Sequence, residues 1–188
     1  MPPTPSPFAL GLFFFLSELA LNLFKRSKAG AASKDRNSLR LIWLLNSLGG
    51  GLAVFFMFRR PAWAISWTGH YYYAGLGMFL LGLALRWYSI FYLGRFFTTN
   101  VAIATDHHLI ESGPYRFVRH PSYSGSMLMV IGLGWCLGNF ASLLTLAVCF
   151  FIAVLRRIRV EEDALTAAFG GQYIAYCKKT RRLIPLLY

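Results

Sequence analysis

The sequence is short of charge, and above all of acidic charge. Only 14% of its 188 residues are charged, and 7 Asp and Glu stand against 19 Lys and Arg. A typical soluble domain is about 25% charged. Hydrophobic residues reach 56%, and phenylalanine alone contributes 17. Such a chain has too few polar side chains to cover a soluble globule and is too apolar to be disordered. Length and composition therefore predict one domain that lies in a lipid bilayer.

The usual motifs for metal and nucleotide binding are also missing. Cys136 and Cys149 lie inside apolar runs and Cys177 stands alone, with no C-x-x-C pair. They are therefore predicted to be buried thiols and not metal ligands. No glycine-rich turn leads from a strand into a helix, which excludes a Rossmann-type cofactor domain. A set of glycines within apolar runs is instead expected to let helices pack closely: Gly49-Gly50-Gly51, Gly75, Gly77, Gly132 and Gly134.

The basic residues lie between the apolar runs. Juxtamembrane positive charge accounts for this pattern, so nucleic-acid binding is not expected. With segments 25–40, 94–120 and 156–188 on one side of the membrane, that side collects 16 of the 19 Lys and Arg. By the positive-inside rule this side is cytoplasmic, which puts the N-terminus outside and the C-terminus inside.

Long apolar stretches predict the membrane helices. Residues 8–24, 41–58 and 61 to about 93 are predicted as three spans. The uncharged stretch 121–155 would be about 50 Å long as one helix, whereas the hydrocarbon core is about 30 Å thick. Because Gly138-Asn139 at its midpoint has turn chemistry, the stretch is predicted to form a tight hairpin of two short helices.

The expected fold is therefore an all-α membrane protein with about five transmembrane helices. Residues 1–60 are predicted as an N-terminal transmembrane hairpin, and 61–188 as a core that carries the functional site. Only 94–120 and 156–188 have enough polar variety to build a site, and both lie on the predicted cytoplasmic face. The second begins as a helix that continues the last span and is interrupted at Gly170-Gly171.

Arg119-His120-Pro121-Ser122-Tyr123 is the first candidate site motif, at the mouth of the hairpin. Proline suits the first turn of a helix, and it leaves the preceding Arg119 and His120 to point into a pocket. A plain helix start with an interfacial arginine explains the residues at least as well.

Arg157 and Glu161 form the second candidate, four residues apart and so on one helix face. Arginine can clamp a carboxylate while glutamate accepts hydrogen bonds from an amine or ribose hydroxyls, so the pair could hold two ligands side by side. The alternative is a surface ion pair worth about 0.2–0.5 kcal/mol.

The third candidate is the loop that begins with His107 and His108. Neighbouring histidines on a loop rarely complete a tetrahedral site, so metal is not expected there. A loop that presents main-chain groups to a planar ring is favoured. Glu18 and Arg86, the ionisable residues within spans, are interpreted as nearer structural than functional.

Taken together, the ordered motifs resemble the integral-membrane methyltransferases related to isoprenylcysteine carboxyl methyltransferase. The elements that carry the resemblance are Leu93-Gly94, His107-His108-Leu109-Ile110, Gly113-Pro114-Tyr115, Arg119-His120-Pro121-Ser122-Tyr123, Arg157 with Glu161-Glu162, Phe169-Gly170-Gly171-Gln172-Tyr173 and Arg182-Leu183-Ile184-Pro185. They cover about the last hundred residues, in order and at matching spacings, and residues 1–60 show no specific match.

The resemblance implies S-adenosylmethionine as cofactor, a membrane-partitioned lipophilic acceptor such as a prenylcysteine-like carboxylate, and a cytoplasmic pocket. Arg157 matches the residue that meets the acceptor carboxylate, with Arg119 nearby as a second catalytic residue. The positions that match the cofactor site are His107, His108, Leu109, Ile110, Tyr115, His120, Pro121, Ser122, Tyr123 and Glu161.

Three alternatives stay open at this stage. A phospholipid amine N-methyltransferase would need a base, for which Glu162 is the candidate. The end of the chain is also similar to membrane sterol reductases that take hydride from NADPH, although Glu161-Glu162 favours the methyltransferase. A non-enzymatic membrane scaffold or small transporter would bind no cofactor.

Overall fold

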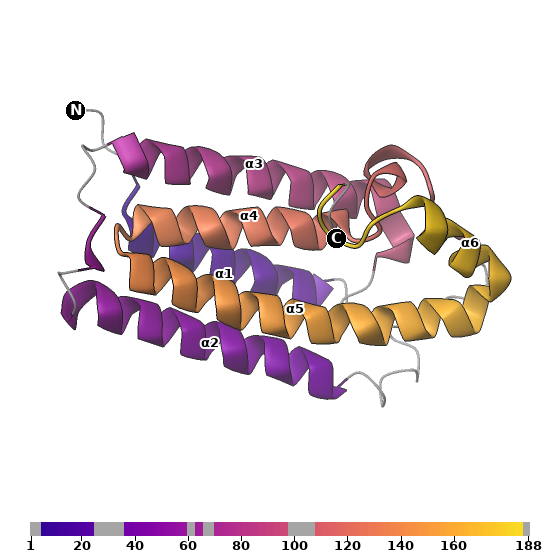
Figure 1. Cartoon of the computed structure of the whole chain (residues 1–188), viewed down its shortest axis with the longest axis horizontal. Helices are drawn as coiled ribbons and strands as arrows, with labels where there is room; N and C mark the ends of the chain where they lie inside the picture. The colour runs from indigo at the N-terminus through magenta and orange to yellow at the C-terminus, as the bar shows by residue number, and fades with distance from the viewer. Residues whose placement is uncertain (1–4, 25–35, 60–62, 66–69, 98–107, 186–188) are drawn as a thin grey trace.

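The computed structural model describes residues 5–24, 36–59, 63–65, 70–97 and 108–185 (Figure 1). Within these residues the only extended pairings are two isolated bridges, so the predicted all-α fold is confirmed. The helices are α1 Pro7–Phe24, α2 Arg36–Arg59, α3 His70–Leu93, α4 Pro121–Cys136, α5 Phe140–Phe169 and α6 Gly171–Lys179, with 3-10 turns η3 Gly94–Phe96 and η4 Gly113–Arg116.

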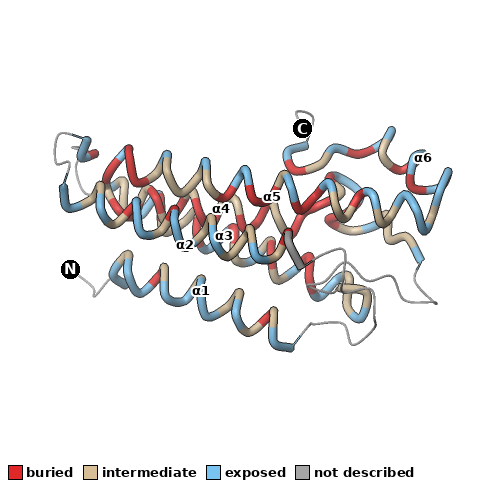
Figure 2. The backbone as a smooth tube through the Cα atoms, turned by 90° about the horizontal axis from the view of Figure 1, so that it is seen from below, coloured by how far each residue is buried: buried red, intermediate tan, exposed pale blue. Residues whose placement is uncertain are grey.

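Helices α2, α3, α4 and α5 run alongside one another along the length of the molecule, and α6 turns back at the far end of α5 (Figure 1). Helix α3 packs along α4, and α2 along α5, while α1 stands apart from the other helices in the second view (Figure 2). In the described part of the chain, four helices are long and apolar enough to cross a membrane: α1, α2, α3 and α5. Helix α4, with 16 residues, is shorter than a usual span.

The hairpin between α4 and α5 forms at the predicted turn. Gly138 adopts a φ of 64° that favours glycine, and the Asn139 side chain caps α5 by accepting from the backbone of Ala141 at 3.0 Å. The predicted continuation of the second helix beyond the apolar run is confirmed, because α5 has 30 residues and ends at Phe169, just before Gly170-Gly171. No helix-breaking residue follows the apolar run until Gly170, whose φ of 52° ends the helix.

The third span begins later than predicted. Ahead of α3, Ile65 donates its N–H to the Gly138 carbonyl at 2.9 Å, and Ala64 pairs with Asn139. This short segment is therefore extended along the hairpin turn and is not part of a helix. The absence of charge in the sequence could not reveal that, because an apolar segment can satisfy its backbone groups on a neighbour as well as within a helix.

Helices α3 and α4 approach closely because glycines face each other at two levels. A β-carbon added to Gly82 would lie 2.5 Å from the Gly125 carbonyl oxygen, and one added to Gly75 would lie 2.7 Å from the Gly132 oxygen. These contacts are with backbone atoms, which cannot move aside as a flexible side chain can. The predicted role in helix packing is confirmed for Gly75 and Gly132 and is wrong for Gly50, Gly51 and Gly77, where an added β-carbon would meet nothing within 4 Å.

Gly82→Ala should therefore destabilise the protein, by about 1–3 kcal/mol, since the added methyl overpacks the interface. Thermal unfolding of the detergent-purified protein measures the effect. The matched control is Gly77→Ala on the same helix, where an added β-carbon meets nothing within 4 Å. A melting temperature lowered equally by both substitutions would contradict the close-packing explanation.

Candidate active site

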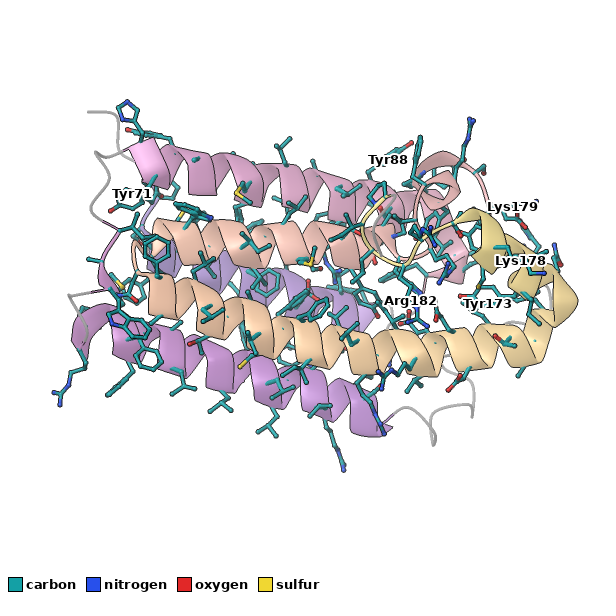
Figure 3. All side chains as sticks on the ribbon, in the orientation of Figure 1. Tyr71, Tyr88, Tyr173, Lys178, Lys179 and Arg182 are labelled. Carbon is teal, nitrogen blue, oxygen red and sulfur yellow. The ribbon has the colours of Figure 1, made fainter. Side chains whose placement is uncertain are left out.

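The end of the chain returns to the start of α4 and builds one wall of the candidate site. Arg119 and His120 donate their backbone N–H groups to the carbonyls of Arg181 and Arg182, at 2.7 and 3.0 Å. Ser124 adds a side-chain hydrogen bond of 2.5 Å to the Leu183 carbonyl. Two segments some sixty residues apart in sequence are thereby joined, and Figure 3 shows Arg182 and Tyr173 together at this end of the bundle, opposite Tyr71.

Glu161 is the centre of a buried polar cluster. Its Oε1 accepts hydrogen bonds from Arg157 Nε at 2.8 Å and from the Tyr123 hydroxyl at 2.5 Å. Its Oε2 lies 3.5 Å from His120 Nδ1. Arg157 is only 1% exposed, and its Nη1 donates to Ser38 Oγ of α2 at 2.9 Å. The predicted pair on one helix face exists, with Arg157 buried and Glu161 half-buried, so the alternative of a surface ion pair is wrong.

Glu162 forms a second ionic cluster beside the first. It accepts from Arg119 Nε at 3.0 Å and from Arg182 at 2.9 and 2.7 Å. Arg119 also donates to the Thr180 carbonyl at 2.5 Å. Because two guanidinium groups hold this carboxylate in its ionised form, Glu162 is poorly suited to accept a further proton.

His120 lies between the two carboxylates and couples the clusters. Burial on its own lowers the pKa of this imidazole, but hydrogen bonds and charge from Glu161 and Glu162 outweigh burial and raise its pKa above the usual value. The two clusters together contain three arginines, a histidine that protonates readily and two carboxylates. This end of the bundle carries an excess of positive charge and favours an anionic ligand.

A cavity of about 580 Å³ opens onto these clusters. Its far wall is apolar and comes largely from α1 and α2, for example Phe15, Trp43 and Val54, together with Phe150 of α5. Its other end is lined by charged and hydroxyl-bearing side chains, Arg157 and Glu161 among them. Both predicted parts of the chain, 1–60 and 61–188, contribute to this one cavity.

The structure gathers most of the predicted site residues around this cavity. Those that line it are Leu109, Ile110, Tyr115, Arg119, His120, Ser122, Tyr123, Arg157 and Glu161. His108 instead packs edge-to-face on Phe96 with ring centroids 4.7 Å apart. Pro121 lies with Leu183 in a separate hollow. His107 lies outside the described residues.

Other residues at the cavity carried no assigned role in the sequence. Tyr173 and Tyr176 of α6 line it, and Tyr176 donates its hydroxyl to the Tyr115 carbonyl at 2.6 Å. Tyr173 belongs to the motif Phe169-Gly170-Gly171-Gln172-Tyr173, and Tyr176 follows it at helical spacing, which were the available signals. No signal in the sequence pointed to Ser38, the hydrogen-bond partner of Arg157, because the two residues are 119 positions apart.

The residues present also fit a bound ligand. Among the described residues, four cavity-lining side chains each keep a buried polar atom without a hydrogen-bond partner: Glu18 Oε1, Arg86 Nε, His120 Nε2 and Tyr173 OH. Leaving such atoms unsatisfied costs about 1–3 kcal/mol each, so buried polar groups are normally paired. A polar ligand in the cavity could satisfy them.

These features define a class: an α-helical integral membrane protein with a mixed polar and apolar ligand cavity at one end of its helix bundle. Comparison with known proteins identifies it further. The family model of the isoprenylcysteine carboxyl methyltransferase (ICMT) family matches residues 75–167, a range that includes Arg119, Arg157 and Glu161. The chain belongs to this family, and it is an enzyme of the methyltransferase class.

Its relatives cover nearly its whole length. Protein-S-isoprenylcysteine O-methyltransferase of Schizosaccharomyces pombe is 32% identical over 95% of this chain and 81% of its own. Protein-S-isoprenylcysteine O-methyltransferase B of Arabidopsis thaliana is 32% identical over 94% of this chain and 89% of its own. The solved structure of a eukaryotic intramembrane Ras methyltransferase, ICMT, shares the fold with a TM-score of 0.72 at 24% identity, over 96% of this chain and 65% of that chain.

Proposed function

We propose that the protein transfers a methyl group from S-adenosylmethionine to the carboxylate of a lipophilic, membrane-partitioned acceptor, such as a prenylcysteine-like group. The observation that supports this most directly is the single cavity that joins an apolar wall to a positively charged end. An acceptor with a long apolar tail and an anionic head matches both surfaces at once. The relatives named as isoprenylcysteine O-methyltransferases act on such an acceptor.

The cofactor would be held at the polar end. Glu161 would accept hydrogen bonds from it, and Tyr115, His120, Ser122 and Tyr123 would line its pocket together with Leu109 and Ile110. The family resemblance adds His107, His108 and Pro121. When bound, S-adenosylmethionine supplies a sulfonium-activated methyl carbon, which a carboxylate oxygen attacks while the electron pair of the broken C–S bond stays on sulfur.

The chain's own part in the reaction is to position charge and exclude water. Arg157 would orient the acceptor carboxylate, because it lies one helical turn before Glu161 and lines the same cavity. Arg119 would add positive charge beside it. A carboxylate is ionised at neutral pH, having an unperturbed pKa of about 4, so it needs no general base. The partly buried Tyr123 and the buried Ser38 would keep Arg157 in place.

An amine acceptor fits less well. It would need a base, and Glu162, the candidate, is occupied by Arg119 and Arg182. Glu162 is not among the residues that line the cavity. We therefore favour O-methylation over phospholipid N-methylation.

Calorimetric titration of the detergent-purified protein with S-adenosylhomocysteine and with NADPH tests the cofactor. We expect binding of the first only, and tight NADPH binding would favour the reductase. Transfer of a labelled methyl group to N-acetyl-S-prenylcysteine, compared with a phosphatidylethanolamine vesicle, tests the acceptor. Label found in the phospholipid and not in the prenylcysteine would overturn the carboxylate assignment.

We propose further that the site faces the cytoplasm, on the basis of the positive-inside rule. In a variant without the native cysteines, Cys introduced at Arg59 should react in intact cells with a reagent that cannot cross the membrane. Cys introduced at Lys178, which is exposed on α6, should react only after the cells are opened. The reverse labelling pattern would contradict this orientation.

A further inference from the structure

The structure contains an ion pair between α1 and α3 that the proposed mechanism does not use. Glu18 Oε2 accepts from Arg86 Nη2 at 2.7 Å, and Arg86 Nη1 donates to the Ser122 carbonyl at 3.2 Å. Arg86 is 5% exposed, and both residues line the cavity. An arginine and a glutamate at this depth in a membrane bundle are functional-site candidates by default.

The pair keeps one acceptor and one donor unused. Glu18 Oε1 and Arg86 Nε are buried and have no hydrogen-bond partner among the described residues. One atom belongs to an anion and the other to a cation. A ligand that satisfies both must present a donor and an acceptor close together, and opposite charges on these groups strengthen both hydrogen bonds. The zwitterionic end of an α-amino acid offers this combination, with a cationic donor beside an anionic acceptor.

The position of the pair agrees with the proposed cofactor pocket. Ser122, which Arg86 contacts, is followed by Tyr123, the hydrogen-bond partner of Glu161. Tyr115 lies within electrostatic range of both Arg86 and Glu161. Burial and the charge of Glu161 raise the pKa of Tyr115, and Arg86 acts in the opposite direction. Arg86 and Glu161 thus flank the same stretch of the cavity wall.

We propose that Glu18 and Arg86 bind the amino-acid end of the methyl donor, with Arg86 Nε donating to its carboxylate and Glu18 Oε1 accepting from its ammonium group. This inference rests on the proposed function, since S-adenosylmethionine and S-adenosylhomocysteine both carry an α-amino acid. The acceptor's carboxylate alone would satisfy Arg86 and leave Glu18 unpaired. The first helix, which showed no family motif in the sequence, would then complete the cofactor site.

Comparison of three ligands with the unmodified protein provides the main test. Calorimetry should show that S-adenosylhomocysteine binds roughly 10- to 100-fold more tightly than its decarboxylated analogue, and likewise more tightly than its deaminated analogue. Equal affinity for all three would overturn the inference and leave the proposed function intact. If none of them bound, the proposed function itself would fail.

Two variants then assign each contact. Arg86→Gln should abolish the preference for the carboxylate, and Glu18→Gln the preference for the amine. If the pair were purely structural, either substitution would weaken the binding of all three ligands equally and leave the ratios of their dissociation constants unchanged. That result would also overturn the inference. Asn22→Ala is the matched control, because Asn22 lines the cavity from the same helix and donates to the Glu18 backbone carbonyl, at 2.9 Å, and not to its carboxylate. It should retain both preferences.

Discussion

Arg157→Lys should reduce methyl transfer by about a hundredfold or more while S-adenosylhomocysteine binds almost as before. Lysine keeps the positive charge but loses the planar fork that can hold a carboxylate at two points. In the structure, Arg157 uses Nε for Glu161 and Nη1 for Ser38, so its guanidinium is fixed in orientation from two helices. A single ammonium can neutralise Glu161 but cannot reproduce that orientation. Turnover with a prenylcysteine acceptor and calorimetry with S-adenosylhomocysteine measure the two effects separately.

Ser38→Ala is the matched control for this substitution. It removes one fixing contact of Arg157 without changing the guanidinium, so transfer should fall only slightly. If Arg157→Lys retained normal turnover, Arg157 would be no more than the ion-pair partner of Glu161. If it lowered the melting temperature and cofactor affinity along with turnover, Arg157 would support the fold, and its role at the carboxylate would have to be withdrawn.

Local patterns in the sequence were sufficient for the features that depend on neighbouring residues. Arg157 and Glu161 share a face because four positions make about one helical turn. The turn at Gly138-Asn139 followed from the length of the uncharged run and from its residue types. In both cases the structural cause lies within a few residues, so one sequence is enough to reveal it.

Contacts between distant segments could not be found in this way. Ser38 is 119 positions from Arg157, and Glu18 is 68 positions from Arg86. The sequence identified Glu18 and Arg86 only as charges that need a partner in the membrane. Their pairing, and their place on the cavity, depend on how α1 lies against α3 and α4, which no local pattern specifies.

Arg182 is another residue whose role depends on a contact between distant segments. The sequence marked Arg182-Leu183-Ile184-Pro185 as a motif but gave it no function. In the structure, Arg182 holds Glu162 while its backbone carbonyl accepts from His120. A motif at the end of a chain becomes interpretable only when the fold shows which segment it pairs with.

Glu161→Gln should weaken binding of S-adenosylhomocysteine by about 1.5–3 kcal/mol, the value of a hydrogen bond to a charged group. The structure adds a second expected effect. Glu161 is the counter-ion of Arg157, which is 1% exposed, and removal of one partner of a buried ion pair costs about 3–5 kcal/mol of stability. In this variant we therefore expect a higher dissociation constant for S-adenosylhomocysteine, measured by isothermal calorimetry, and a lower melting temperature, measured by thermal unfolding.

The double variant Glu161→Gln, Arg157→Gln separates the two effects. It removes both charges, so much of the lost stability should return, whereas cofactor affinity should stay low because the accepting carboxylate is still absent. Asp163→Asn is the matched control, since Asp163 is an exposed carboxylate two positions along the same helix. It should change neither measurement. Recovery of cofactor affinity together with stability in the double variant would mean that Glu161 acts through the fold, and the cofactor contact would have to be assigned to other residues of the cavity.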